Sequence, residues 1–226
     1  MANVIAVDGP SGAGKSSVSR IVGKRLGYLH VDSGALYRIM TWRCLECGVD
    51  TDDEAAVAAF ADGVEIECRV EDGHIAYYVG GEAPGERIRT PQINAHASKV
   101  AKVKEVRDCI TSLLRGMTGY GNLIIEGRDI TSAVFPDSPA RFYLTASAEA
   151  RARRRRKEEV EKGIADQSEE AVKASLLARD AIDSTRKHAP LVKVDGVVEI
   201  DSSDMTLEEV VQAVVDALPE GWKAAE

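Results

Sequence analysis

The chain has 226 residues, of which 44% are hydrophobic and 29% charged, and its formal net charge is −8 at pH 7. This length suits one large domain, or one domain that carries an insertion. The acidic balance disfavours nucleic acid and anionic membrane surfaces as partners, although basic side chains gathered locally can bind a small anion. No apolar run approaches the roughly 18 residues of a membrane span, and no export signal is visible. Four cysteines make no disulfide scaffold at this length, so we expect a reducing, cytoplasmic setting.

Five short apolar runs predict buried strands of a parallel sheet. They are Val4–Val7, Tyr28–Val31, Leu123–Ile125, Phe142–Leu144 and Val197–Ile200. Helical patterns lie between most of them. The first is Ser16–Leu26, and the last is Thr206–Leu218, which opens with a capping-box pattern. This alternation favours an α/β doubly wound core, with a five-stranded parallel sheet and helices on both faces.

Residues from about 61 to 90 follow a different pattern. Alternating strand-like runs flank Asp72 and Gly73, a dipeptide typical of a tight hairpin. We therefore expect a small antiparallel sheet inserted into the α/β pattern. Thr90 and Pro91 then begin one long helix, as its cap and its first residue, and glycines at 116, 119 and 121 mark its end.

The stretch from Gly9 to Ser16, GPSGAGKS, fits the pattern G-x-x-x-x-G-K-[ST] at every fixed position. It follows a predicted strand and opens a predicted helix, so backbone N–H groups and the helix dipole can hold a phosphate. Lys15 can reach the β- and γ-phosphates of a nucleoside triphosphate, and the Ser16 hydroxyl suits Mg²⁺. A glycine-rich turn that only joins strand to helix is the simpler alternative. The sequence contains neither the N-K-x-D nor the D-x-x-G element of a switch GTPase.

Four further stretches carry arginines, and one of them has six basic residues in seven. They are Val31–Arg38, Ile124–Asp129, Arg151–Lys157 and Ala178–Leu191. Arg128 and Asp129 come at the carboxyl end of a predicted strand, where open α/β sheets bind ligands. Arg179, Asp183 and Arg186 share one helix face. Each stretch alone is also typical of surface ion pairs or a solvated helix. Together with a phosphate loop, they favour a site that brings two polyanions face to face.

The chain carries, in this order, IAVDGPSGAGKSS, VDSGALYR, IRTPQINAHASKVAKVKEVR, IIEGRDI and ARDAIDSTRKHAPL. In this combination it closely resembles bacterial-type cytidylate kinases, nucleoside monophosphate kinases of the P-loop superfamily, over essentially the whole chain. The resemblance implies one kinase domain, residues 1–226. Within it we expect a core (about 1–33, 119–148 and 176–226), an acceptor region with the inserted sheet (about 34–118) and a helical lid (about 149–175). It also implies transfer of the γ-phosphoryl group of ATP to CMP or dCMP with Mg²⁺, in pyrimidine nucleotide metabolism.

The same resemblance implies the site residues. ATP would bind Gly9, Pro10, Ser11, Gly12, Ala13, Gly14, Lys15, Ser16 and Ser17. CMP would bind Ser33, Arg38, Ser98, Arg107, Arg128, Asp129, Arg179, Asp183 and Arg186. The cytosine edge would be read by Ser98, Arg107 and Asp129, the ribose held by Arg179 and Asp183, and the acceptor phosphate held by Arg38, Arg128 and Arg186. The catalytic cations would be Lys15, Arg128, Arg186 and three lid arginines on one helix face, Arg151, Arg154 and Arg155.

Two positions depart from the family's pattern. Many members have Asp where this chain has Glu126, and some have glycine in place of Ser16, so the family does not demand Ser16 as a Mg²⁺ ligand. An acceptor phosphate is mostly a dianion near pH 7, because its second pKa is about 6. The expected chemistry is therefore positioning and charge neutralisation, with little need for a general base.

Other functions stay open on the sequence. A kinase for UMP, AMP, GMP or a non-nucleotide acceptor would share the phosphate loop and the lid. A nucleotide-dependent binding protein could use Arg151–Lys157 as a nucleic-acid patch, although the acidic net charge weighs against it. Cys44 and Cys47 form a C-x-x-C pair without the further matched ligands of a zinc site. We expect a monomer by default, with small-molecule substrates and neither nucleic acid nor membrane as partner.

Overall fold

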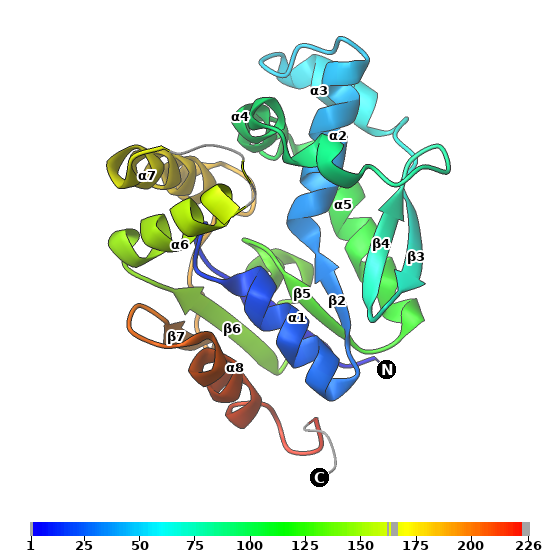
Figure 1. The fold of residues 1–226 in the computed structure, drawn as a ribbon. Helices are drawn as coiled ribbons and strands as arrows, with labels where there is room; N and C mark the ends of the chain where they lie inside the picture. The colour runs from blue at the N-terminus through cyan, green and yellow to red at the C-terminus, as the bar shows by residue number, and fades with distance from the viewer. Residues whose placement is uncertain (1, 162, 164–166, 223–226) are drawn as a thin grey trace.

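The computed structural model describes residues 2–161, 163 and 167–222, and in this part of the chain a seven-stranded sheet has the order β3-β4-β2-β5-β1-β6-β7 (Figure 1). The strands are β1 (Val4–Asp8), β2 (Leu29–Asp32), β3 (Glu67–Glu71), β4 (His74–Tyr78), β5 (Leu123–Glu126), β6 (Ala140–Thr145) and β7 (Val198–Asp201). The five predicted strands are all present, and each pairs in parallel with at least one other of the five. The α/β core with a mostly parallel sheet is confirmed.

The sheet has seven strands rather than the predicted five. β3 and β4 form the expected antiparallel hairpin, but the hairpin does not stand apart as a second sheet. His74 of β4 pairs with His30 of β2, and the backbone N–H of His30 donates to the carbonyl of Gly73 at 3.0 Å. β4 therefore extends the edge of the main sheet. Alternation within a hairpin identifies the hairpin's own pairing but gives no information about a third strand.

Helices cover both faces of the sheet. They are α1 (Lys15–Leu26), α2 (Ser33–Glu46), α3 (Glu54–Ala61), α4 (Pro91–Val100), α5 (Lys104–Gly116), α6 (Ala148–Glu161), α7 (Glu169–Thr185) and α8 (Leu207–Asp216), with short turns η1 (Gly85–Arg89), η2 (Met117–Tyr120) and η3 (Ile130–Val134). α1 and α8 lie on the face turned to the viewer in Figure 1, and α2, α3 and α5 belong to a second buried cluster. α6 packs against α7 beyond the end of β6. None of the described helices is long and apolar enough to cross a membrane.

The single long helix predicted from Pro91 is two helices. Thr90 caps α4 as predicted, because its hydroxyl accepts from the N–H of Ile93 at 3.2 Å. The chain then leaves the helical conformation, since Val103 has ψ 126° before α5 begins. Val103 is 2% exposed. The apolar spacing keeps a helical phase across this break, so the sequence pattern alone does not reveal it.

The helix caps offer a direct test of local stability. The carboxylate of Asp53 accepts from the N–H groups of Ala55 and Ala56 at 3.0 Å each, which satisfies two free donors at the start of α3. We predict that Asp53→Ala lowers the free energy of unfolding by about 1 kcal/mol, while Asp53→Asn retains most of it. Urea unfolding followed by circular dichroism measures the difference. Equal stability of Asp53→Ala and the wild type would contradict the capping role.

Candidate active site

The predicted phosphate loop joins the central strand β1 to α1 and curls at positions that only glycine tolerates. Gly9 has φ +147°, and a Cβ there would lie 1.9 Å from the carbonyl oxygen of Leu144. Gly12 has φ +78°, and its Cβ would lie 3.1 Å from the Cβ of Arg151. The expected strand–loop–helix arrangement is therefore present. The loop also lies hard against β6 and α6, so a side chain at either glycine would displace it.

Lys15 folds back over this loop. Its ammonium donates to the carbonyl oxygens of Gly9 and Pro10 at 2.8 Å each, and the residue is only 6% exposed. Burial, reinforced by the positive charge of Arg128, lowers the pKa of Lys15 to about 7. Ser16 and Ser17 are exposed in the first turn of α1. The loop thus holds one amine whose charged form a bound anion would favour.

A buried carboxylate, Asp129, gathers two of the predicted arginines. Asp129 forms an ion pair with Arg107 of α5, and Arg186 Nη2 lies 3.5 Å from Asp129 Oδ1. Arg107 Nη1 also donates at 2.8 Å to the carbonyl of Ala101, in the break between α4 and α5. The break therefore supplies an acceptor that a continuous helix would have used internally. Ser98 lies half-buried on α4, which packs against α7.

A second carboxylate, Asp183 of α7, gathers three arginines. The spacing predicted that Arg179, Asp183 and Arg186 share one helix face, but α7 ends just before Arg186, which follows it in an extended conformation as the C-cap. Arg128 comes from the turn after β5. Arg128 Nε lies 3.1 Å from Asp183 Oδ2, Arg186 Nη1 lies 3.8 Å from Oδ1, and Arg179 Nε lies 4.0 Å from Oδ2. Asp183 is 4% exposed. Arg186 stands between the two carboxylates, so Asp129 and Asp183 belong to one continuous network.

A third carboxylate, Asp32, holds the start of α2. It caps the helix through the N–H of Ala35 at 3.0 Å and pairs with Arg38 at 2.8 Å and with Arg89 at 3.7 Å. Burial would raise the pKa of Asp32, but Arg38 and Arg89 outweigh it and the pKa is lowered. Ser33, the next residue, donates to the backbone carbonyl of Glu126 at 2.6 Å. α2 is thereby fixed against the end of β5.

The arginines of this cluster outnumber the carboxylates Asp32, Asp129 and Asp183 that pair with them. The buried Nε atoms of Arg38 and Arg179 have no hydrogen-bond partner among the residues described. Burial and the nearby Arg128 lower the pKa of Arg179 to about 10. Buried donors without acceptors are costly, and an anion with several oxygens would satisfy them. The arrangement fits a phosphate group beside the phosphate loop.

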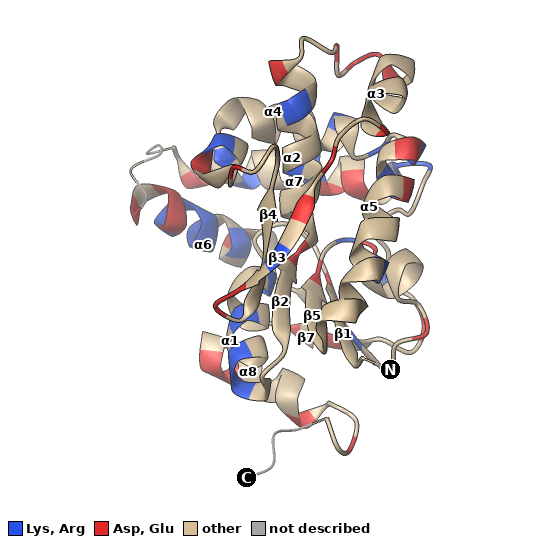
Figure 2. Ribbon diagram, turned by 90° about the vertical axis from the view of Figure 1, so that its right-hand side faces the viewer, with Lys and Arg blue, Asp and Glu red and all other residues tan. Residues whose placement is uncertain are grey.

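The three arginines that the sequence assigned to a lid lie on α6 and have different partners, although their spacing places them on one helix face. Arg151 is buried, donates to the carbonyl of Ser11 at 3.0 Å and pairs with Asp180. Arg154 Nη1 donates to the Ser202 hydroxyl at 2.9 Å. Arg155 Nε lies 2.8 Å from Glu159, and its charge contributes to the low pKa of Arg179. At least four of the six basic residues of this run thus contact the protein itself, since Lys157 Nζ also lies 3.9 Å from Glu161 Oε1. Figure 2 shows the basic residues grouped along α6, with acidic residues at its end. The expected lid also includes residues 162 and 164–166, which lie outside the described residues.

Sequence reasoning gave no role to several charged residues of this site. Arg89 binds Asp32, and Asp180 accepts from the N–H of Ser11 at 3.1 Å. Glu126 lies 3.2 Å from His30, with both side chains buried. Asp8 ends the buried strand β1 and is fully buried. The sequence did carry a signal for Asp8, because a charged residue ends the otherwise apolar run of β1. The other three contacts join segments that are distant in sequence.

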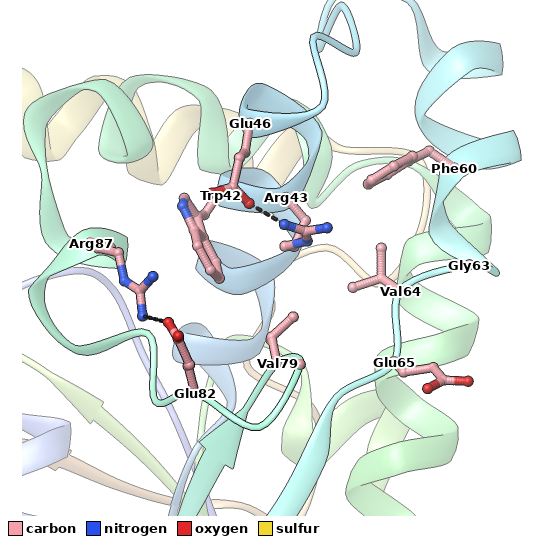
Figure 3. A pocket seen from close by; sticks show the side chains of 11 residues that line it. Trp42, Arg43, Glu46, Phe60, Gly63, Val64, Glu65, Val79, Glu82 and Arg87 are labelled. Carbon is pink, nitrogen blue, oxygen red and sulfur yellow. Dashed lines mark hydrogen bonds and ion pairs between the residues drawn. The ribbon is translucent and has the colours of Figure 1, made fainter.

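A separate hollow of about 400 Å³ lies on the outer side of α2, around Trp42 (Figure 3). The guanidinium groups of Arg87 and Arg43 lie 4.9 and 5.5 Å from the centre of the Trp42 ring. Arg87 pairs with Glu82 at 3.4 Å, and Arg43 pairs with Glu46. Each of these two arginines of the hollow is therefore already paired with a glutamate of the same hollow. This Trp42 hollow is a poorer match for a nucleotide phosphate than the site beside Lys15.

The described part of the chain holds no group of three or more His, Cys, Asp or Glu side chains that could bind a metal ion. Cys44 is buried, Cys47 is exposed, and both are free. The exposed hydroxyl of Ser16 beside Lys15 remains available as a single oxygen ligand. This fits Mg²⁺, which is commonly bound by one or two protein oxygens together with substrate phosphates and water.

Known proteins match this chain along nearly its whole length. A family model described as cytidylate kinase matches residues 5–220. A cytidylate kinase of Clostridioides difficile is 42% identical over 215 residues, which span 95% of this chain and 97% of that protein. One of Geobacter sulfurreducens is 39% identical over 221 residues, which span 98% of this chain and 94% of that protein. A solved structure of an uncharacterized protein from Eubacterium ventriosum has a TM-score of 0.52 at 8% identity, covering 95% of this chain and 96% of that chain, which shows a shared fold alone.

The low pKa of Lys15 predicts proton uptake when a nucleoside triphosphate binds. With a pKa of about 7, most Lys15 side chains are neutral at pH 8, and nearby phosphates would raise the pKa again. We expect ATP binding at pH 8 to take up close to one proton, and much less at pH 6, where Lys15 is already charged. Calorimetry in buffers of different ionisation enthalpy measures the uptake. Lys15→Arg, which stays protonated, should show none, and equal uptake by this variant and the wild type would refute the assignment.

Proposed function

The chain belongs to the cytidylate kinase family, and we propose that it transfers the γ-phosphoryl group of ATP to CMP or dCMP, giving ADP and CDP or dCDP. One observation carries the proposal beyond family membership. The phosphate loop with Lys15 lies beside a cluster of arginines held by three carboxylates, the buried Asp129 and Asp183 and the partly buried Asp32. A donor and an acceptor, both anionic, can therefore be held next to each other.

In this proposal, the acceptor phosphate of CMP lies against Arg38, Arg128 and Arg186. The unsatisfied Nε of Arg38 and the electrostatic influence of Arg128 on both Lys15 and Arg179 support this placement. Arg128 stands between the two phosphate sites and would offset repulsion as the phosphates approach. Because the acceptor is already an anion, positioning and charge neutralisation supply the catalysis.

The proposed cytosine site is formed by Ser98, Arg107 and Asp129, with Arg179 and Asp183 holding the ribose. A carboxylate accepts from the N4 amino group of cytosine, the kind of contact that proteins use to read this base. Uracil presents a carbonyl at the same position, so Asp129 would repel it. The pairing of Asp129 with Arg107 holds the carboxylate in one orientation and supports a role in base selection.

We propose that the Ser16 hydroxyl contributes one ligand to a Mg²⁺ ion that accompanies ATP. When bound, the ion would neutralise phosphate charge and help orient the γ-phosphoryl group. Of the lid arginines, Arg155 is the one whose charge acts on Arg179. It is therefore our candidate for contacting the transferring group. Arg151 and Arg154, which already bind Ser11 and Ser202, would hold the lid beside the phosphate loop.

We further propose that the protein works in the cytoplasm as a monomer, with nucleotides rather than nucleic acid as its partners. Cys44, Cys47, Cys68 and Cys109 are all free, which fits a reducing compartment. Exclusion of water by the lid would limit wasteful hydrolysis of ATP.

Turnover with a panel of acceptors tests the proposed function. With ATP and Mg²⁺ in a coupled assay for ADP release, we expect fast turnover with CMP and dCMP, slower turnover with UMP and very little with AMP or GMP. Lys15→Ala should nearly abolish turnover while the protein remains folded. A purine acceptor preferred over CMP, or substantial activity left in Lys15→Ala, would contradict the assignment.

Arginine substitutions test the acceptor site separately. Arg179→Ala and Arg186→Ala should each raise KM for CMP by roughly 10- to 100-fold, the effect of losing a hydrogen bond to a charged group. The KM for ATP should change much less. Arg43→Ala, which removes an arginine of the Trp42 hollow, is the matched control and should change neither constant. Unaltered KM values for CMP in both test variants would remove Arg179 and Arg186 from the site.

A further inference from the structure

Asp8 is a buried acid that the mechanism has not used. It ends β1 one residue before the phosphate loop, and it is fully buried. Its Oδ1 accepts from the N–H of Ile130 at 2.9 Å, and its Oδ2 accepts from the N–H and the hydroxyl of Thr131 at 2.7 Å each. All three donors belong to η3, the turn that directly follows Asp129. One carboxylate thus joins the base of the phosphate loop to the segment beside the proposed cytosine site.

Asp129 occupies the N-cap position of η3 yet makes no capping hydrogen bond with its own side chain. The side chain of an N-cap aspartate ordinarily accepts from the N–H two or three residues further on. Here the N–H of Thr131, two residues on, is taken by Asp8. The carboxylate of Asp129 points instead to Arg107 and Arg186. Asp8 therefore accepts the capping hydrogen bond from Thr131 that the side chain of Asp129 would otherwise accept.

We propose that Asp8 is a positioning residue for base recognition. By capping η3 from a different strand, it leaves the carboxylate of Asp129 free to pair with Arg107 and to accept the amino group of cytosine. This inference rests on the proposed function, because it assigns the base contact to Asp129. Asp8 itself would touch neither nucleotide.

The energetics agree with a role beyond stability. Burial raises the pKa of Asp8 to about 6, and the hydrogen bonds from Thr131 limit the rise, so the carboxylate is ionised at pH 7.5. A buried charge held mainly by hydrogen bonds is a costly way to cap one turn. Asp8 is fixed in register with Tyr143 on the neighbouring strand β6, so it offers η3 an acceptor that moves little. A rigid acceptor in a central strand is well suited to hold a recognition residue in place.

Asp8→Asn tests the proposal with little change of shape. The amide directs an NH₂ group at the donors of η3, so one N–H loses its acceptor and competes for the carboxylate of Asp129. The readout is the ratio of kcat/KM for CMP to that for UMP, measured at pH 7.5. We expect this ratio to fall by roughly 10-fold or more, the scale of one hydrogen bond to a charged group. The KM for ATP should stay within about threefold, because the phosphate loop itself is unchanged.

A double-mutant cycle separates positioning from general loosening. If Asp8 acts through Asp129, then Asp8→Asn combined with Asp129→Asn should show no greater loss of base preference than Asp129→Asn alone. Additive losses would overturn the proposal. Thr131→Val should lower the ratio and Thr131→Ser should restore it, which keeps the test valid if Asp8→Asn does not fold. Ser138→Ala is the matched control, because Ser138 donates to the carbonyl of Val4 at the opposite end of β1. It should leave the ratio unchanged.

A crystal structure of Asp8→Asn makes the test independent of turnover. We expect the carboxylate of Asp129 to turn from Arg107 towards the N–H of Thr131. An Asp129 that stays on Arg107 would overturn the proposal even if the protein phosphorylates CMP as expected. Wild-type protein that fails to phosphorylate CMP would instead overturn the proposed function, and the position of Asp129 in the variant would still decide the capping claim.

Discussion

The site depends on holding many cations together when no nucleotide is bound. Arginines brought this close repel one another, and burial makes each charge more costly. The structure meets this constraint with carboxylates that are shared: the buried Asp129 and Asp183 are bridged by Arg186, and the partly buried Asp32 serves two arginines. These carboxylates do not accept from every guanidinium donor. The buried Nε atoms of Arg38 and Arg179 have no hydrogen-bond partner among the described residues. A phosphate dianion would accept from these donors and neutralise the remaining positive charge.

These ion pairs also assemble the parts of the molecule. Asp129 follows β5 and binds α5 through Arg107, while Asp183 binds the same turn to α7 through Arg128. Asp32 fixes α2 and η1 through Arg38 and Arg89. The turn after β5 is therefore joined to α5 and α7, and α2 is joined to η1. A substitution that removes one of these carboxylates would disturb several helices at once, since each carboxylate serves more than one partner.

Much of this could be predicted from the sequence where the signal is local. The buried strands, the phosphate loop and the approach of Arg179 and Arg186 to Asp183 each follow from spacing within a few residues, although Arg186 lies just past the end of α7. The pairing of β4 with β2 and the contact of Arg154 with Ser202 could not, because each depends on a partner distant in sequence. The break at Val103 could not either, because the apolar spacing continues through it in a helical phase. The roles of the individual site residues in binding and catalysis remain predictions that require measurement.

The most direct test is a crystal structure of the protein with CMP bound. The account predicts that the CMP phosphate contacts Arg38, Arg128 and Arg186, and that the amino group of cytosine lies within hydrogen-bond distance of Asp129. Asp129 would keep its ion pair with Arg107 in that complex. CMP bound in the Trp42 hollow, or with its phosphate on Lys15 and its base away from Asp129, would contradict the account.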